Sequence, residues 1–450
     1  MLNKAHRIHL VGIGGIGMSG LAKILANLGY TISGSDLCDT FTTKFLKSIG
    51  VKIYIGHDRT NINNIDTLVI SSAVSKSNVE VKEALRKNIP IIYRADMLSE
   101  ILSSKRIISI AGSHGKTTTT ALIAIVLLYA NFDPTILAGG ILNNINTNAT
   151  LGNSDYAVIE TDESDGSFLK FSSYISVVTN IDNDHLEHYD NDIKNLKKAF
   201  FTYIDLVSNN GISIVCYDNA SIRDILKNKN LKNNVTYGIY GNPNVKAVNI
   251  KIEKGFTSFI VIYNGKRLGS IIIKILGLHN ILNALAAISV GLCLDIPFKS
   301  ISKAIKHFSG VKRRLEFKGV NNKIIVIDDY AHHPTEIKNT IRAIKIRYPT
   351  RRLIVLFQPH RYTRTHSLFQ EFCESFSNVD MLKILDIYSA GETPIKGVTS
   401  DLLVKNIKSS GYVSKFSNLA DLKKVLIEGD IVLTIGAGDV WKIGEKLLTI

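Results

Sequence analysis

The chain has 450 residues, of which 45% are hydrophobic and 21% are charged, so it is long enough for about three domains with sizeable cores. This composition excludes a disordered, collagen-like or coiled-coil protein. The formal net charge is +15, but Lys and Arg are spread along the chain, without a basic strip interleaved with aromatic residues. We therefore expect no nucleic-acid partner, and the charge is compatible with phosphorylated ligands.

The cysteines and the apolar runs indicate in which cellular compartment the protein works. The four cysteines lie far apart with no Cys-x-x-Cys spacing, which excludes a disulfide framework or a zinc ribbon. The longest apolar run, residues 121–130, is too short to span a bilayer. The first strand leads directly into a glycine loop and not into an apolar signal segment. We expect a cytoplasmic protein with no membrane partner.

Three segments each begin with an apolar strand and continue with alternating strand and helix patterns. This order predicts an α/β fold with parallel sheets. The predicted strands are 7–11, 53–55, 68–70 and 89–92 in the first segment, 106–111, 156–160 and 175–178 in the second, and 324–327 and 353–357 in the third. Residues 235–276 alternate β-branched and polar side chains, which predicts a further sheet-like part before a helix that starts near His279.

A glycine loop follows the first strand. Residues 12–17 fit the pattern Gly-x-Gly-x-x-Gly, residues 18–28 are predicted to form the next helix, and Ser35 and Asp36 end a second strand about twenty positions on. Such a loop brings backbone N–H groups and a helix N-terminus close to a pyrophosphate. The pattern favours a phosphate-bearing ligand over a turn that only packs helix on strand, and it leaves the nucleotide open. Taken alone, it would indicate a nicotinamide dehydrogenase.

A second glycine loop follows the first strand of the second segment. Residues 112–118 read Gly-Ser-His-Gly-Lys-Thr-Thr, although the first glycine of the standard phosphate-binding pattern is missing. In such a loop, backbone N–H groups surround the phosphates, Lys116 contacts the β- and γ-phosphates, and the Thr117 hydroxyl reaches Mg²⁺. We predict ATP binding here. A dehydrogenase has no use for ATP, so the two loops together favour an enzyme that couples ATP to a nucleotide-linked substrate.

Acidic residues follow the next two predicted strands of this segment. Glu160, Asp162 and Glu163 follow one strand, and the other is followed by Asp residues and His185. Mg²⁺ prefers oxygen ligands and keeps several waters, so one carboxylate with Thr117 and ATP oxygens would suffice. The spacing leaves open which of the three carboxylates is the ligand. His185 is expected to contact metal or phosphate.

The remaining candidates are amides, histidines and arginines. Asn280 and Asn283 lie on one predicted helix face, which suits a nucleobase or ribose, although helix capping is the simpler interpretation. Residues 328–334 follow a strand, and their Pro is expected in the first turn of a helix. Arg361 and Arg364 follow another strand and suit a carboxylate or phosphate, with a solvated basic loop as the alternative.

These motifs resemble the Mur ligase family from one end of the chain to the other. The matching motifs are GIGGIGMSG (12–20), AGSHGKTTTT (111–120), IETDESDGSFL (159–169), NIDNDHLEHY (180–189), LGLHNILNALAA (276–287), the pair at 313–314, DDYAHHPTE (328–336) and FQPHRYTRT (357–365). Within the family, the first and last motifs point to the member that adds L-alanine to UDP-N-acetylmuramate. They also point to its relative, a recycling ligase that attaches a whole peptide to the same sugar nucleotide.

The resemblance implies three domains. Residues 1–103 would form a Rossmann-like UDP-binding domain, and residues 104–312 a central P-loop ATPase-like domain with a parallel sheet and a smaller β-rich part. Residues 313–450 would form a Rossmann-like domain that binds the amino acid. The implied reaction joins L-alanine to the lactyl carboxylate of UDP-N-acetylmuramate, with ATP and Mg²⁺, in peptidoglycan precursor synthesis.

The resemblance also implies residue roles. The UDP-sugar would be held by Gly12, Gly14, Gly15, Ile16, Gly17, Ser35, Asp36 and Ser71. ATP would be held by Gly112, Ser113, His114, Gly115, Lys116, Thr117, Thr118, Asn280 and Asn283. Mg²⁺ would be bound by Thr117, Glu160 and His185, and Arg314 and Asp329 would contact ATP. The amino-acid pocket would be lined by His332, His360, Arg361 and Arg364, and the base that takes the amine proton would be His332 or His360.

One position departs from several family members. They carry a carbamylated lysine fifteen residues after the metal histidine, and this chain has Phe200 there, which fits the alanine-adding member. Three alternatives remain: the recycling ligase, a nicotinamide-dependent oxidoreductase built on the first loop, and a basic ATPase acting on nucleic acid.

Overall fold

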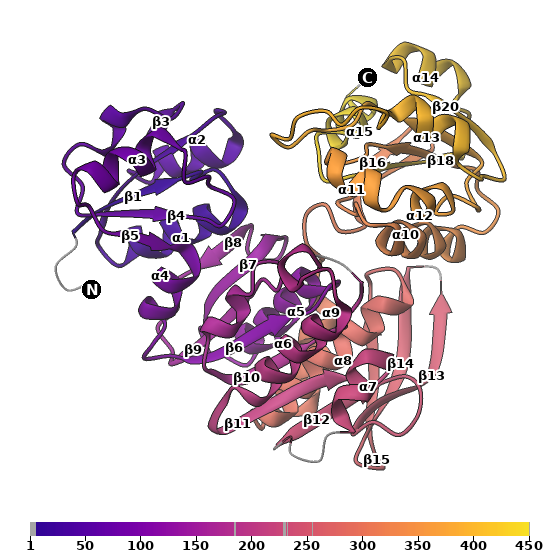
Figure 1. Cartoon of the computed structure of the whole chain (residues 1–450). Coiled ribbons are helices and arrows are strands. Elements are labelled where there is room, and N and C mark those ends of the chain that lie inside the picture. The colour runs from indigo at the N-terminus through magenta and orange to yellow at the C-terminus, as the bar shows by residue number, and fades with distance from the viewer. Residues whose placement is uncertain (1–5, 184–185, 228–230, 232, 254, 450) are drawn as a thin grey trace. The chain divides into compact units, whose positions relative to one another are not determined.

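The computed structural model describes residues 6–183, 186–227, 231, 233–253 and 255–449, and its backbone forms three β-sheets flanked by helices (Figure 1). The chain divides into two compact units. The second unit consists of Ile250–Ser258, Ile272–Ile281 and Ser309–Ile450, and the first unit consists of the rest of the chain. The first and central sheets lie mainly in the first unit, and the third sheet lies in the second unit. Among the described residues, no helix is long and apolar enough to cross a membrane.

The first sheet has the strand order β3-β2-β1-β4-β5, and all its pairs are parallel. Its strands are β1 (Arg7–Val11), β2 (Thr31–Asp36), β3 (Lys52–Ile55), β4 (Thr67–Ile70) and β5 (Ile91–Tyr93). Its helices are α1 (Ile16–Asn27), α2 (Phe41–Ser48), η2 (Arg59–Ile62), α3 (Val79–Arg86) and α4 (Arg94–Ile101). The order reverses between β1 and β4, so the loops that follow these two strands meet at one edge, where ligands of such folds bind.

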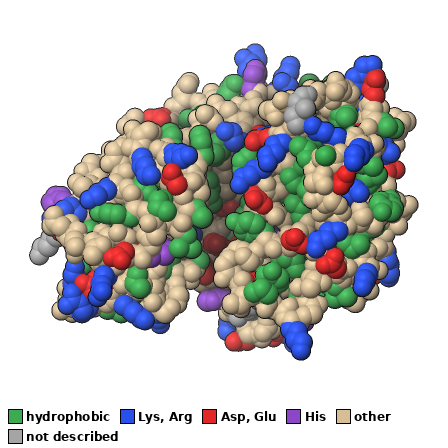
Figure 2. All heavy atoms as spheres, turned by 90° about the horizontal axis from the view of Figure 1, so that it is seen from above, with side chains coloured by type: hydrophobic (Ala, Val, Ile, Leu, Met, Phe, Trp, Pro, Cys, Tyr) green, Lys and Arg blue, Asp and Glu red, His purple; other side chains and the backbone are tan. Residues whose placement is uncertain are grey.

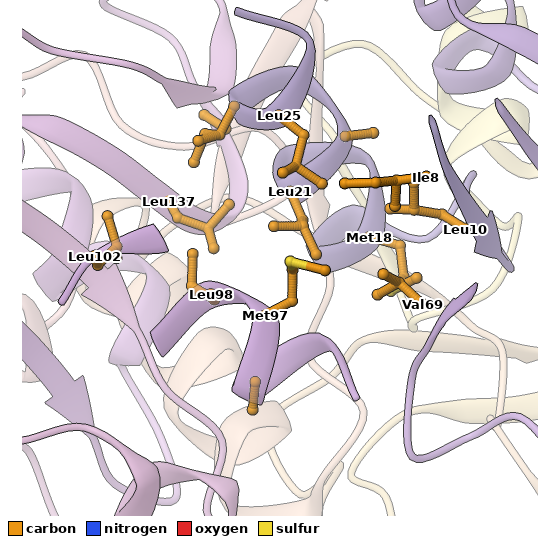
Figure 3. Close-up of a cluster of buried hydrophobic side chains, with 14 of the residues drawn as sticks. Ile8, Leu10, Met18, Leu21, Leu25, Val69, Met97, Leu98, Leu102 and Leu137 are labelled. Carbon is orange, nitrogen blue, oxygen red and sulfur yellow. The ribbon is translucent and has the colours of Figure 1, made fainter. Parts of the chain in front are cut away.

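Helix α1 is packed on both sides. Its apolar residues recur every three to four positions, and Met18, Leu21 and Leu25 are buried against strands of the first sheet. The same hydrophobic cluster continues through Met97 in α4 to Leu137 of the central sheet (Figure 3). The first and central sheets therefore share one core.

The central sheet has the order β15-β14-β13-β12-β11-β10-β6-β9-β7-β8. Its strands are β6 (Arg106–Ala111), β7 (Thr135–Leu142), β8 (Thr147–Thr150), β9 (Tyr156–Glu160), β10 (Ser173–Val178), β11 (Val207–Cys216), β12 (Asn234–Gly238), β13 (Val245–Glu253), β14 (Phe256–Tyr263) and β15 (Lys266–Ile273). Its helices are α5 (Lys116–Tyr129), η3 (Ser167–Lys170), η4 (Leu186–Tyr189), α6 (Ile193–Asp205), α7 (Ala220–Leu226), α8 (Leu278–Cys293) and α9 (Phe298–His307). The β-rich stretch predicted for residues 235–276 forms strands that extend this sheet at one edge.

The third sheet has the order β16-β17-β21-β18-β19-β20 and is parallel except for the β16–β17 pair. Its strands are β16 (Glu316–Asn321), β17 (Ile324–Asp329), β18 (Leu353–Phe357), β19 (Met381–Ile384), β20 (Tyr412–Lys415) and β21 (Ile431–Ile435). Its helices are α10 (Pro334–Arg347), α11 (Tyr362–Ser367), α12 (Phe369–Cys373), α13 (Ser400–Asn406), α14 (Leu419–Val425) and α15 (Trp441–Leu448). The central strands β17, β18 and β21 are apolar and buried, as expected of strands covered by helices on both faces.

The surface charge is dispersed on the face seen in Figure 2. Lys and Arg side chains alternate there with acidic, hydrophobic and other side chains and form no continuous basic strip. On that face, the charge excess of the sequence is not gathered into one patch.

Candidate functional site

The second glycine loop joins β6 to α5. Gly112 has φ +132° and Gly115 has φ +81°, both in the region that favours glycine, and α5 begins directly after Gly115 with Lys116. The helix therefore begins five residues before the apolar run 121–130. Because Lys116 and Thr117 lie in the first turn of the helix, the unpaired N–H groups of that turn face the same side as the loop.

The segment that follows β10 holds this loop in place. The backbone N–H of His114 donates to the Asn180 side chain at 2.8 Å, and the Asn180 amide donates back to the His114 carbonyl at 2.9 Å. The backbone N–H of Asp182 donates to the Ser113 hydroxyl at 2.9 Å, and His114 Nε2 lies 3.2 Å from the Asp182 carboxylate. The sequence indicated only a metal or phosphate cluster in this segment and gave no sign that it holds the loop.

Lys116 is paired with a buried carboxylate. Its Nζ lies 2.7 Å from Glu163 Oε1 and 2.6 Å from the Gly112 carbonyl, and Glu163 is only 1% exposed. Burial opposes the charge on Lys116, but the carboxylates of Glu163 and Asp162 outweigh it, so the pKa of Lys116 lies above its usual value. Burial raises the pKa of Glu163, whose Oε2 has no hydrogen-bond partner among the described residues. Lys116 is therefore a fixed positive charge beside the loop.

Thr117 and Glu160 lie together next to this pair. The Thr117 hydroxyl donates to Glu160 Oε1 at 2.9 Å, and the backbone N–H of Gly139 donates to Glu160 Oε2 at 2.6 Å. The sequence could not distinguish the surroundings of these carboxylates, but the structure does: Glu160 contacts Thr117, and Glu163 contacts Lys116. Hydroxyl and carboxylate oxygens are suitable ligands for Mg²⁺, which needs few ligands from the protein when phosphate oxygens supply the rest.

His185 lies outside the described residues, so its predicted metal role stays a prediction. Within the part of the chain that the structure describes, no cluster of three or more His, Cys, Asp or Glu side chains is arranged to hold a metal. Phe200 is fully buried in α6 and packs on Phe168, with ring centroids 5.1 Å apart.

The two amides of α8 have different surroundings. Asn283 accepts a hydrogen bond from the Thr119 hydroxyl at 3.1 Å, and its Oδ1 lies 2.7 Å from where a Cβ on Gly115 would be. The Asn280 amide donates to the carbonyl of Leu276, one turn earlier in the chain. Asn283 is thus brought to the second glycine loop, whereas Asn280 makes the local, cap-like contact that the sequence analysis held to be the simpler interpretation.

The first glycine loop joins β1 to α1. The backbone N–H groups of Gly12 and Ile13 donate to the Ser35 carbonyl at 2.8 and 3.0 Å, and the Gly14 N–H donates to Asp36 Oδ2 at 2.8 Å. The loop is therefore tied to the end of β2, as the spacing predicted. Ser71 follows β4, the other neighbour of β1, and so lies at the same edge of the sheet.

The Ser35 side chain belongs to a buried polar network. Its hydroxyl is fully buried, donates to Glu80 Oε2 at 2.6 Å and lies 3.0 Å from His57 Nδ1. The Asn61 amide donates to the other oxygen of Glu80 at 2.7 Å. The sequence gives no sign of this network, because its members come from β2, from residues 57–61 and from α3, with no shared motif.

In the second unit, Asp329 holds the chain that leads into the third sheet. Its two oxygens accept the backbone N–H groups of Leu315, at 2.7 Å, and of Ala331, also at 2.7 Å. Burial raises its pKa to about 6, with Arg314 and these hydrogen bonds opposing. Arg313 pairs with Asp328 at 3.0 Å, and Arg314 lies 3.8 Å from the Glu336 carboxylate. The charge of Arg314 also acts on Asp329, so these two predicted residues lie close together.

The predicted amino-acid residues come together in the second unit. His332 and His360 have ring centroids 6.1 Å apart, His360 stacks on Tyr388, and Arg364 Nη1 lies 3.4 Å from His360 Nδ1. Burial lowers the pKa of His332 to about 3 and that of His360 to about 4, and the Arg364 charge adds to both effects. Both rings are therefore neutral at pH 7.

Arg361 belongs to the same group and has a strained backbone. It adopts φ +71°, which is uncommon for a side chain of this size, and its N–H donates to the Tyr388 carbonyl at 2.8 Å. Strain of this kind is often retained where a side chain must be aimed at a ligand.

Comparison with known proteins agrees with this architecture. The model of the Mur ligase family catalytic domain matches residues 7–106, that of the Mur ligase middle domain matches residues 110–291, and that of the Mur ligase glutamate ligase domain matches residues 313–438. These matches cover most of the chain, which therefore belongs to the Mur ligase family.

Individual relatives cover the whole chain. The UDP-N-acetylmuramate–L-alanine ligase of Endomicrobium trichonymphae is 54% identical over 451 residues, covering 100% of both chains. The crystal structure of UDP-N-acetylmuramate-alanine ligase from Thermotoga maritima superposes with a TM-score of 0.83 at 29% identity, covering 98% of each chain. A murein peptide ligase from Psychrobacter arcticus has a TM-score of 0.74 at 26% identity, covering 99% of this chain and 98% of its own.

Proposed function

We propose that this chain is an ATP-dependent ligase that joins L-alanine to the lactyl carboxylate of UDP-N-acetylmuramate and releases ADP and phosphate, in peptidoglycan precursor synthesis. The observation that carries the proposal is the second glycine loop, where Lys116 and the Thr117–Glu160 pair lie at the start of one helix. The full-length relative at 54% identity bears the name of this activity. We place the reaction in the cytoplasm.

The substrates are assigned to loops of the three sheets. The UDP-sugar is assigned to Gly12, Gly14, Gly15, Ile16, Gly17, Ser35, Asp36 and Ser71. ATP is assigned to residues 112–118, Asn280 and Asn283, with Arg314 and Asp329 as further contacts. L-Alanine is assigned to His332, His360, Arg361 and Arg364, and an Arg takes its carboxylate.

The lactyl carboxylate is a poor acylating group, so it must first be activated. A carboxylate oxygen attacks the γ-phosphorus of ATP, ADP leaves, and an acyl phosphate forms; the neutral amine of alanine then attacks the carbonyl carbon and phosphate leaves. Lys116 offsets the charge on the moving phosphoryl group. Thr117 and Glu160, with His185, would hold Mg²⁺, which supplies further positive charge at the phosphates.

The amine of alanine must lose a proton in the second step. His332 and His360 are the candidates, because their neutral rings lie beside Arg364 and retain an unprotonated nitrogen at pH 7. Their low pKa values make each a weak base, so such a group acts by accepting the proton as the new bond forms.

A phosphate-release assay tests the proposal. With UDP-N-acetylmuramate, ATP and Mg²⁺ present, we expect release to require L-alanine. Release that instead requires a tripeptide would identify the recycling ligase. The family assignment gives no support to the nicotinamide-dependent alternative, which predicts NADH binding at the first loop and no phosphate release.

A further inference from the structure

Arg94 is a cation of the first unit to which the sequence analysis gave no role. It is the first residue of α4, directly after β5, and its side chain is partly exposed. A Cβ added at Gly17 would lie 3.2 Å from Arg94 Nη1 and 3.4 Å from its Cζ. The guanidinium therefore lies against the first turn of α1, the turn that follows the first glycine loop.

The guanidinium is not held by a hydrogen bond or ion pair within the part of the chain that the structure describes. Among the described residues, Arg94 forms no hydrogen bond or ion pair, whereas the neighbouring cation Lys170 is neutralised by Asp96 at 2.5 and 2.6 Å. A partly buried guanidinium without a carboxylate is unusual, because burial removes water that is not replaced. The arrangement indicates that a bound anion completes its hydrogen bonds.

A cavity of about 210 Å³ adjoins Arg94. Its walls come from the loop after β4 and the start of α4, through Ser72, Arg94 and Ala95, and from the chain after β9, through Asp165, Ser167 and Lys170. Asp165 is already used, because its Oδ1 accepts the Ser167 N–H at 3.0 Å. Arg94 is therefore the cation of this cavity that forms no hydrogen bond or ion pair with a described residue, whereas Lys170 is paired with Asp96.

Arg94 also acts on the acidic segment that carries Glu160 and Glu163. Burial opposes the charged form of Asp162, but Lys116, the hydrogen bonds from Ser164 and the charge of Arg94 lower its pKa below the usual value. Arg94 thus lies between the first glycine loop and the segment that borders the second.

We propose that Arg94 binds the diphosphate of the UDP-sugar. This inference rests on the proposed function. The first loop offers only backbone N–H groups, and the Asp36 carboxylate on the Gly14 N–H lowers the positive potential there. Arg94 supplies the compensating positive charge beside the same turn, with a planar group that matches phosphate oxygens.

The test measures binding of UDP by calorimetry, because UDP has the diphosphate but neither sugar nor carboxylate. We expect Arg94→Ala to weaken UDP binding on the order of 10- to 100-fold, the usual effect of losing a charge-assisted hydrogen bond. Arg94→Lys should restore part of the affinity, since it keeps the charge and loses the planar fork. ATP binding should stay unchanged in both variants, which also shows that they are folded.

A matched control is Arg86→Ala. Arg86 lies at the end of α3, is 70% exposed and, among the described residues, pairs only with Glu83, so UDP binding should not change. Unchanged UDP binding in Arg94→Ala would overturn the inference. Weaker binding of UDP-N-acetylmuramate alone, with UDP unaffected, would also overturn it, because the anion would then be the lactyl carboxylate.

The two proposals fail in different ways. If wild-type protein binds UDP but releases no phosphate with UDP-N-acetylmuramate, ATP and L-alanine, the proposed function is wrong. If wild-type protein turns over and Arg94→Ala binds UDP equally well, only the role of Arg94 is wrong.

Discussion

The amine of Lys116 and the carboxylate of Glu163 form an ion pair of 2.7 Å at the start of α5. Glu163 thus supplies, beside Lys116, the negative charge that the phosphates of bound ATP would otherwise supply. An incoming γ-phosphate must therefore compete with Glu163 for the amine, and the buried carboxylate keeps Lys116 charged and in position before ATP arrives.

The first prediction concerns Lys116. We expect Lys116→Ala to lower the rate of phosphate release by about 100- to 1000-fold, because a preorganised charge on the transferred group is lost. UDP binding, measured by calorimetry, should be unchanged, since the first glycine loop is untouched. Turnover at the wild-type rate would contradict the assignment of the second glycine loop.

The second prediction concerns the metal. Because Glu160 rather than Glu163 lies on the Thr117 hydroxyl, Glu160→Gln should raise the Mg²⁺ concentration for half-maximal activity by about 10- to 100-fold. Asp155→Asn is the control, since Asp155 is exposed and precedes β9, the strand that Glu160 ends. An unchanged Mg²⁺ requirement in Glu160→Gln would show that another carboxylate holds the ion.

The third prediction concerns Gly112. An added Cβ would lie 2.2 Å from the Thr179 hydroxyl oxygen, and φ is +132°. Gly112→Ala should lower the free energy of unfolding by about 2–5 kcal/mol, from backbone strain and overpacking together. Gly29→Ala separates the two causes, because Gly29 has φ +90° with nothing within 4 Å, and should cost about 1–2 kcal/mol. Urea denaturation measures both, and equal losses would show that the clash is relieved.

The fourth prediction concerns pH. The pKa of His332 is lowered to about 3, so between pH 6.5 and about 3 the unfolded chain binds a proton there that the folded chain does not. Stability should therefore fall as the pH drops below 6.5. Asp329, with its pKa raised to about 6, has the opposite effect between about pH 4 and 6, so the comparison must be between variants.

Denaturation midpoints at pH 7.5, 6 and 5 make that comparison. His332→Gln should lose less stability on acidification than wild type, whereas His366→Gln, at an exposed position of the nearby α11, should behave as wild type. Identical acid sensitivity in all three proteins would show that His332 titrates normally.

The parts of this protein that follow from local patterns were predictable. Both glycine loops lie at the ends of apolar strands, and the buried runs at 106–111 and 353–357 are the strands β6 and β18. Strand β16 was missed, since it is a half-exposed edge strand with little apolar character. The apolar run that begins at 121 marks only the later part of α5, because the helix begins with Lys116 and four threonines.

The side-chain pairings were not predictable. The sequence places Glu160, Asp162 and Glu163 within four positions, and only the path of the chain after β9 decides that Glu160 meets Thr117 and Glu163 meets Lys116. Arg94 carries no signal in the sequence, because an arginine at the first position of a helix is ordinary. Its position against Gly17 depends on how α4 packs beside α1.

The core shared by the first two sheets has a practical consequence. Leu137 of β7 reaches α1 so closely that a Cβ on Gly20 would lie 2.3 Å from it, and the Asn148 amide donates to the Ile16 carbonyl at 2.8 Å. A fragment truncated at Ser103 would leave that side of α1 facing water, and we expect such a fragment to aggregate. Ligand screening against the amino-terminal lobe should therefore use a piece that retains the neighbouring sheet.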